Sequence, residues 1–409
     1  MPSGKPVSNV IRQHIVLGVS IFALSGCAGV TELARDVITG LADIDVSGVT
    51  DLFGGGKVEL SPEQTAQLVK IPPARPLWRN ALEESQAAVF FPVFENGAVY
   101  AASTEGRLVR FNSASGKEEG TIDTKGRLSG GIGTGENMLM VGTFKGEVLA
   151  YDRENGKPLW TAQVSSEVLS PPQAAGGMVV VRAGDGRIFG LEAGSGKRKW
   201  VYQGATPSLT VRNFAGVLIS GDTVYSGFAG GKLVTINLSN GVAGWEAVVA
   251  RPRGATELER IADITSPPMI DEQQVCAVAY QGRVACFEIG TGNQLWAKDV
   301  SSNAGLAMDN NYVYVSENRG SISAYDKRDG TSIWKQELLN GMKLSPPLLQ
   351  GNHIVVGDSQ GHVNVIKSEN GDMISRSASD DSPIVTRPVS LPNGFAVQTR
   401  KGGIFAFGL

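Results

Sequence analysis

The stretch KGEVLAYDRENGKPLW, Lys145–Trp160, decides the fold because its pattern recurs along the chain. Counted from Gly146, a small residue, an apolar residue and an acid stand at positions 4, 5 and 6, a second glycine at 10 and a tryptophan at 14. The copies are spaced by about 42 residues, the period of a four-stranded propeller blade. Strong copies begin at Gly186, Gly231, Gly282 and Gly320, and weaker ones at Gly106, Gly361 and Gly402.

Each copy predicts the same order of strands and turns. In the copy at Gly320, Tyr312–Glu317 and Ile322–Asp326 read as two strands of a hairpin, and a further strand surrounds Trp334. The motif Ser-Pro-Pro precedes the first strand of several blades, where proline costs no interior ladder bond. The tryptophan at position 14 gives each blade a large apolar plate for its neighbour, and its indole N–H should find a backbone acceptor.

The two ends of the repeat region predict how the ring closes. The copy at Gly402 reaches Leu409 before a fourth strand can form, and Trp78, in RPLWRNAL, is the one tryptophan of the six that no copy contains. We therefore predict an all-β, eight-bladed β-propeller of four-stranded antiparallel blades over residues 75–409. An N-terminal strand completes the last blade, so closure leaves no open sheet edge between first and last blades.

Residues 1–26 are predicted to be a lipoprotein signal peptide. Lys5 and Arg12 precede the apolar run Ile15–Leu24, which is too short to span a bilayer as a helix. Leu24-Ser25-Gly26-Cys27 resembles a lipobox, which predicts lipidation of Cys27; the alternative is a chance cysteine near an ordinary cleavage site. Acyl chains on Cys27 would anchor the protein, and Ala28, in place of aspartate, favours the outer membrane.

Residues 27–74 lack the repeat and are interpreted as a lipid-anchored tether. Ser61-Pro62-Glu63-Gln64 predicts a helix start, with serine as N-cap, proline at N1 and glutamine closing a capping box. The short helix should run through Val69 and end before Pro72-Pro73.

Two insertions interrupt the spacing of the repeat. The first glycines lie 45 residues apart from Gly186 to Gly231 and 51 apart from Gly231 to Gly282. The extra residues, 203–217 and 249–266, fall in connections from the last strand of one blade to the first of the next. Long neighbouring loops on one rim of a rigid scaffold are typical of a docking surface, although solvated loops are the alternative.

Composition argues against several other functions. A net charge of −3 offers no basic face for nucleic acid. His353 and His362 lie near Asp358, but nothing completes a metal set, and no serine has a placed histidine base, so we predict no metal, no cofactor and no catalytic residue.

Cys276 and Cys286 flank one predicted hairpin turn. A two-residue turn would place them on opposite faces of the sheet, whereas a three-residue turn would oppose them and allow a disulfide in an oxidising compartment. We favour the two-residue turn and two packed thiols.

The pattern AYDRENGKPLW resembles the tryptophan-docking repeat of quinoprotein dehydrogenases, which hold pyrroloquinoline quinone over calcium. This chain has no Cys-Cys pair of the kind those enzymes use. Repeat, lipobox and length together resemble the BamB family, lipoprotein subunits of the outer-membrane β-barrel assembly (Bam) machine, from Cys27 to Leu409.

The most specific part of this resemblance lies in the insertions, in PSLTVR and TELERIAD. In that family these loops dock on periplasmic POTRA domains of the barrel protein BamA; family members often carry a second acid where this chain has Thr265. The resemblance implies a non-enzymatic scaffold, monomeric within a hetero-complex at the periplasmic face of the outer membrane, that assists assembly of outer-membrane proteins. The alternatives are a quinoprotein-like dehydrogenase and a lipoprotein scaffold of another envelope complex. The residues implied to bind the partner are Leu209, Val211, Arg212, Glu257, Arg260 and Asp263.

Overall fold

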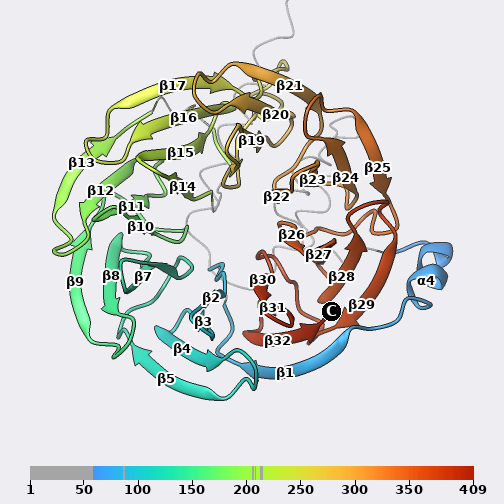
Figure 1. Cartoon of the computed structure of the whole chain (residues 1–409), viewed down its shortest axis with the longest axis horizontal. Helices are drawn as coiled ribbons and strands as arrows, with labels where there is room; N and C mark the ends of the chain where they lie inside the picture. The colour runs from blue at the N-terminus through green and yellow to red at the C-terminus, as the bar shows by residue number, and fades with distance from the viewer. Residues whose placement is uncertain (1–58, 86–87, 205–206, 208, 212–214) are drawn as a thin grey trace, which may run out of the picture. The chain divides into compact units, whose positions relative to one another are not determined.

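The computed structural model describes residues 59–409 except 86–87, 205–206, 208 and 212–214. The predicted signal peptide, Cys27 and the predicted tether up to residue 58 lie outside the described residues. The described part belongs to one compact unit, Val58–Leu409. It consists of eight four-stranded antiparallel sheets that follow one another around a ring (Figure 1), which confirms the predicted propeller.

Within each blade we letter the strands A to D in sheet order, with A nearest the centre of the ring and D at its circumference (Figure 1). Blades 1 to 4 comprise β2 (Val93–Glu95), β3 (Ala98–Ala102), β4 (Arg107–Asn112), β5 (Glu118–Asp123); β6 (Gly133–Gly135), β7 (Met138–Gly142), β8 (Glu147–Asp152), β9 (Pro158–Gln163); β10 (Gln173–Ala175), β11 (Met178–Arg182), β12 (Ile188–Glu192), β13 (Arg198–Tyr202); and β14 (Val217–Ser220), β15 (Thr223–Phe228), β16 (Lys232–Asn237), β17 (Ala243–Val248).

Blades 5 to 8 repeat the arrangement, and the last blade takes its D strand from the other end of the unit. They comprise β18 (Met269–Ile270), β19 (Gln274–Val278), β20 (Arg283–Glu288), β21 (Gln294–Asp299); β22 (Gly305–Met308), β23 (Tyr312–Ser316), β24 (Ile322–Asp326), β25 (Ser332–Gln336); β26 (Leu348–Gln350), β27 (His353–Gly357), β28 (His362–Lys367), β29 (Met373–Ala378); and β30 (Val389–Leu391), β31 (Gly394–Gln398), β32 (Gly403–Gly408) with β1 (Arg75–Ala81).

The ring closes where β1 pairs antiparallel with β32. The register sets Arg75 opposite Gly408 and Trp78 opposite Ala406. The N-terminal strand is therefore the D strand of blade 8, as predicted.

The six tryptophans occupy one structural position. Each sits on a D strand, and its indole N–H donates to a backbone carbonyl of the next blade, as predicted for a buried indole. The acceptor is always the residue seven positions after the first glycine of that blade. The pairs are Trp78 with Ser113 (2.8 Å), Trp160 with Ala193 (2.7 Å), Trp200 with Leu238 (2.9 Å), Trp245 with Ile289 (3.0 Å), Trp296 with Lys327 (2.7 Å) and Trp334 with Ser368 (2.9 Å).

The glycine at position 10 of the repeat receives that same tryptophan. Gly196 has a left-handed φ of 69°, and a Cβ on it would lie 2.6 Å from the ring of Trp160. Positions 10 and 14 are thus two halves of one contact between neighbouring blades. Blade 1 has Gly120 in the tryptophan position, and there Ile122 lies against Gly156 instead.

Residues 59–74 pack against blades 6 and 7. The helix α4 (Pro62–Leu68) begins at Ser61, with both hydrogen bonds of the predicted capping box, and Val69 is its C-cap. Leu68 is buried in a cluster that includes Leu339 and Met342, between β25 and β26. The backbone N–H of Arg376 donates to the Pro72 carbonyl at 3.0 Å. This part of the predicted tether is therefore held on the propeller.

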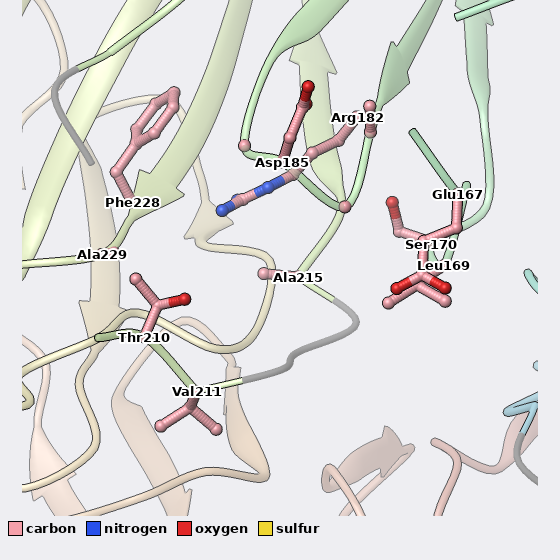
Figure 2. Close-up of a pocket in the computed structure, with 13 residues that line it drawn as sticks. Glu167, Leu169, Ser170, Arg182, Asp185, Thr210, Val211, Ala215, Phe228 and Ala229 are labelled. Carbon is pink, nitrogen blue, oxygen red and sulfur yellow. The ribbon is translucent and has the colours of Figure 1, made fainter. Parts of the chain in front are cut away.

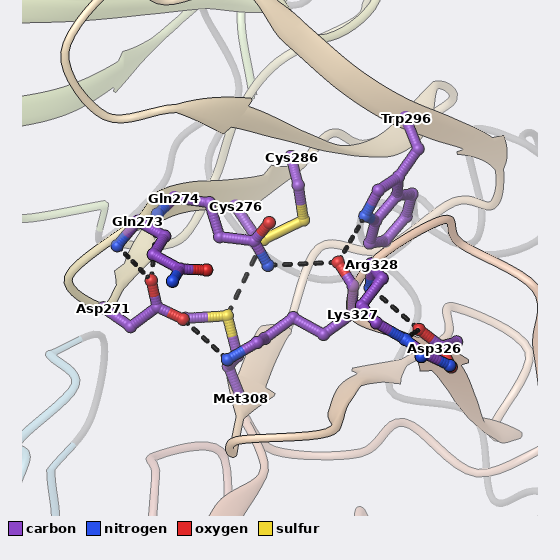
Figure 3. The surroundings of a disulfide bond; sticks show 10 residues. All are labelled: Asp271, Gln273, Gln274, Cys276, Cys286, Trp296, Met308, Asp326, Lys327 and Arg328. Carbon is purple, nitrogen blue, oxygen red and sulfur yellow. Dashed lines mark hydrogen bonds and ion pairs between the residues drawn. A yellow bond between two sulfur atoms is a disulfide. The ribbon is translucent and has the colours of Figure 1, made fainter.

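Cys276 and Cys286 form a disulfide between β19 and β20 (Figure 3), so the predicted pair of free thiols is wrong. The turn contains three residues, Tyr280 to Gly282, because Val278 pairs with Val284, and this register sets the cysteines directly opposite. The sulfur of Cys276 also lies 3.7 Å from that of Met308 in blade 6.

Candidate docking surface

The two insertions lie on the rim formed by the D–A connections and the B–C turns, which we call the docking rim. One joins β13 to β14 and the other joins β17 to β18. The backbone N–H of Val211, in the first insertion, donates to the carboxylate of Asp263, in the second, at 2.7 Å. Gly230, in the B–C turn of blade 4, donates to the same carboxylate at 3.0 Å. Two loops distant in sequence thus share one surface.

Asp263 is the centre of this arrangement, and it is only 1% exposed. Its carboxylate accepts hydrogen bonds from the backbone N–H groups of Val211, at 2.7 Å, and Gly230. Its carbonyl accepts one from Tyr280, in the B–C turn of blade 5, at 2.8 Å. Burial raises the pKa of Asp263, and the two backbone hydrogen bonds and the charge of Arg182 partly offset this. Asp263 therefore lies beneath the surface and joins three segments.

Arg182, at the end of β11, supports the same region from blade 3. Its guanidinium donates to Ser226 Oγ at 3.3 Å and to the Gly227 carbonyl, and it lies 5.2 Å from the centre of the Phe228 ring. Burial lowers the pKa of Arg182 to about 10, and the nearby charge of Asp263 acts in the opposite direction. The side chain borders a cavity of about 250 Å³ whose lining also includes Val211 and Phe228 (Figure 2).

The sequence prediction missed Arg182, although the repeat holds a signal for it. The position four residues before the first glycine holds a charged side chain, Arg182, in the copy at Gly186 and an uncharged residue in every other copy. The residues at that position are Ala102, Gly142, Arg182, Gly227, Val278, Ser316, Gly357 and Gln398.

The remaining predicted partner-binding residues are mostly at the surface. Leu209 is 40% exposed, Val211 is half-buried, and Glu257 and Arg260 are exposed. Arg212 lies outside the described residues. The prediction also missed Leu258, which is 44% exposed beside Glu257 and presents a second apolar side chain.

The turn that carries Glu257, Leu258 and Arg260 is held by Glu259. Its carboxylate accepts from the N–H groups of Thr256 (3.0 Å) and Ala255 (2.7 Å), and these hydrogen bonds lower its pKa. The turn therefore has a defined shape although its side chains face solvent.

Thr265 follows Asp263 by two residues, at the position where members of the family that the sequence resembles often carry a second acid. It is buried, and its hydroxyl donates to the Asn303 carbonyl at 3.1 Å. Here the position links blades 5 and 6 rather than presenting a charge.

Two further properties of the described residues concern function. No group of three or more histidine, cysteine or acidic side chains among them is placed to hold a metal ion. In the same part of the chain, no helix is long and apolar enough to cross a membrane.

These features define a closed eight-bladed propeller of the tryptophan-docking type, with a built-up rim at blades 3 and 4. The family model for the outer membrane protein assembly factor BamB matches residues 105–336 and 301–407. The chain therefore belongs to the BamB family, whose members are non-enzymatic assembly factors, and this contradicts the alternative of a quinoprotein-like dehydrogenase.

Individual relatives agree over nearly the whole chain. The outer membrane protein assembly factor BamB of Nitrosomonas eutropha is 49% identical over 392 residues, 95% of this chain and 93% of the relative. That of Bordetella pertussis is 34% identical, over 90% of this chain and 95% of its own length. The crystal structure of BamB from Moraxella catarrhalis has a TM-score of 0.76 at 24% identity, over 82% of this chain and 100% of that chain, and supports the fold alone.

Proposed function

We propose that this protein is a lipid-anchored scaffold that docks through blades 3 and 4 of the docking rim on the POTRA domains of a BamA-like barrel protein. It would thereby assist the folding and insertion of outer-membrane proteins and reach other subunits of the complex through that partner. The observation that carries the proposal is the hydrogen bond from Val211 to the buried Asp263. It ties the loop bearing Leu209 to the scaffold.

The surface has the composition of a small interface centre. Leu209 and Leu258 are exposed apolar side chains, and exposed charges such as Glu257 and Arg260 accompany them. Binding energy at such surfaces is concentrated in a few anchors within a polar rim. We assign Arg212 the role of a charge-assisted donor to the partner.

The same proposal places the protein on the periplasmic face of the outer membrane as a monomer within a hetero-complex. Signal residues 1–26 would be removed, and acyl chains on Cys27 would hold the protein on the membrane without a spanning segment. Residues 27–74 would link lipid and propeller, with 59–74 packed on blades 6 and 7.

Co-purification from solubilised envelopes tests the docking surface. Leu209→Asp should abolish recovery of the barrel protein, because it places a charge at an apolar anchor. Leu295→Asp is the matched control, since Leu295 is 49% exposed on β21, away from the rim. Undiminished recovery with Leu209→Asp, or equal loss with both variants, would refute the site.

A further inference from the structure

A second cavity lies where all eight D–A connections meet, at the docking-rim end of the propeller axis. Its volume is about 380 Å³, and every D–A connection contributes at least one residue to its lining. This is within the size range of small-molecule sites. The cavity belongs to the ring as a whole rather than to one blade.

The described lining of this cavity includes three basic side chains and no acidic one. Lys343, Arg387 and Arg400 line it, and no aspartate or glutamate is among its described lining residues. Lys343 and Arg400 are exposed, whereas Arg387 is half-buried within the cavity wall.

Arg387 has fewer partners than a buried guanidinium needs. Its Nη2 donates to the Leu306 carbonyl at 3.0 Å, and both terminal nitrogens lie 3.8 Å from the sulfur of Met269. Its Nε is buried and has no hydrogen-bond partner among the described residues. Burial lowers the pKa of Arg387.

Among the described residues, Arg182 and Arg376 also have side chains with little exposure, and each has an acid to compensate its charge. Arg376 donates to Asp358 at 2.8 Å, and Arg182 interacts with the charge of Asp263. Burying a cation without such a partner costs free energy of folding. An anion that enters the cavity would pair with the charge of Arg387 and supply the hydrogen-bond acceptor that its Nε lacks.

The rest of the wall indicates the kind of anion. Val89, Phe91, Ile132, Val217 and Val385 supply apolar surface. Ser266 also lines the cavity, and its hydroxyl is buried with no hydrogen-bond partner. Apolar walls with a few convergent donors suit a ligand with one charged end and an apolar body.

We propose that the axial cavity binds a small amphiphilic monoanion, a carboxylate on a short apolar chain. The carboxylate accepts from the guanidinium of Arg387, a planar donor matched to it, and the chain lies against the valine and phenylalanine walls. Lys343 and Arg400 attract the anion to the mouth of the cavity.

Calorimetric titration with octanoate tests this site. The protein is the full mature chain with Cys27→Ala, so that no detergent competes for the cavity. Octanoate should bind with one-to-one stoichiometry, whereas octylammonium, which has the same chain and the opposite charge, should not bind. Arg387→Gln should weaken octanoate at least tenfold, about 1.4 kcal/mol. Arg328→Gln is the matched control, since this side chain is 85% exposed in a C–D turn, and it should leave binding unchanged.

A second variant tests the site even if Arg387→Gln fails to fold. The double variant Lys343→Gln/Arg400→Gln changes only exposed side chains and should weaken octanoate severalfold. N-acetylleucinate, a mimic of a peptide terminus, identifies the source of the carboxylate: tighter binding than octanoate assigns a peptide end, and weaker binding a lipid-derived acid. Absence of binding by both acids, equal binding of octylammonium, or full binding by folded Arg387→Gln overturns the proposal.

Discussion

The ring of Trp78 occupies the space that a Cβ on Gly116 would fill, 2.7 Å from where that atom would stand. Its indole nitrogen also donates to the Ser113 carbonyl. This contact joins β1, the D strand of blade 8, to blade 1, so it holds in place the strand that closes the ring.

Trp78→Ala should therefore destabilise the protein by about 3 kcal/mol or more, the usual cost of truncating a large aromatic side chain in a packed position. Chemical denaturation measures the change in the free energy of unfolding. Arg79→Ala, at the exposed neighbouring position of β1, is the control and should change it little. An unchanged unfolding curve for Trp78→Ala would count against closure by this contact.

Gly196→Ala should cost more than about 1 kcal/mol of stability. The substitution adds a Cβ at a left-handed φ of 69° and forces it against Trp160. Gly194→Ala in the same turn is the matched control, because a Cβ there meets nothing within 4 Å. Equal thermal stability of the two variants would contradict the paired roles of positions 10 and 14.

Asp263→Ala should loosen the docking rim by leaving the N–H groups of Val211 and Gly230 without their acceptor, at about 1–3 kcal/mol each. Hydrogen exchange should show faster exchange of these two amides, and recovery of the barrel protein should fall. Glu257→Ala, at an exposed position nearby, should leave the exchange of both amides unchanged. Protection retained in Asp263→Ala would show that the carboxylate does not hold the loop.

Asp358 should make the protein sensitive to acid. Its burial raises its pKa, but the hydrogen bond with His362 and the charge of Arg376 outweigh this, so the pKa is lowered from 3.8. The stabilisation is complete above the ordinary value and is lost as pH falls through the lowered pKa.

Asp358→Asn should remove this part of the acid sensitivity and cost about 3–5 kcal/mol at neutral pH, because Arg376 keeps a buried charge without its partner. Unfolding free energies measured from neutral pH down to the acid transition compare the variant with the wild type. Asp372→Asn changes an exposed acid and should reproduce the wild-type curve. A variant that keeps both stability and acid sensitivity would disprove the role of Asp358.

Reduction of the disulfide should destabilise the protein by about 2–3 kcal/mol, the value that chain entropy gives for so short a loop. Thermal unfolding with and without a phosphine reductant measures the difference. Cys276→Ala/Cys286→Ala is the control, and reductant should not affect it. Reaction of both cysteines with a thiol reagent in the unreduced, denatured protein would exclude the bond.

The architecture could be predicted because five of the eight copies carry both residues of one contact between blades, the glycine at position 10 and the tryptophan at position 14. The length of the turn between Cys276 and Cys286 could not be predicted, since the repeat fixes the residues that follow Gly282 but not how many turn residues precede it. A Cβ on Gly282 would lie 2.6 Å from that of Ala250 in the neighbouring connection, so a contact distant in sequence constrains the turn.

The sequence predicted where the candidate site lies, but not which of its side chains are buried. Periodicity locates the insertions around Leu209 and Asp263, yet it does not reveal that Asp263 is buried while Glu257 is exposed. That distinction arises from hydrogen bonds between loops of different blades, which no local pattern encodes.

The pairing of Arg75 with Gly408 also governs when the molecule can be finished. The two strands are separated by nearly the whole propeller, and contacts of such sequence separation form slowly. Until β32 is available, β1 has no partner and blade 8 lacks its scaffold. The ring can therefore close only after synthesis and export have reached the last strand. A chain truncated before β32 keeps unpaired strand edges that quality-control proteases and chaperones can recognise.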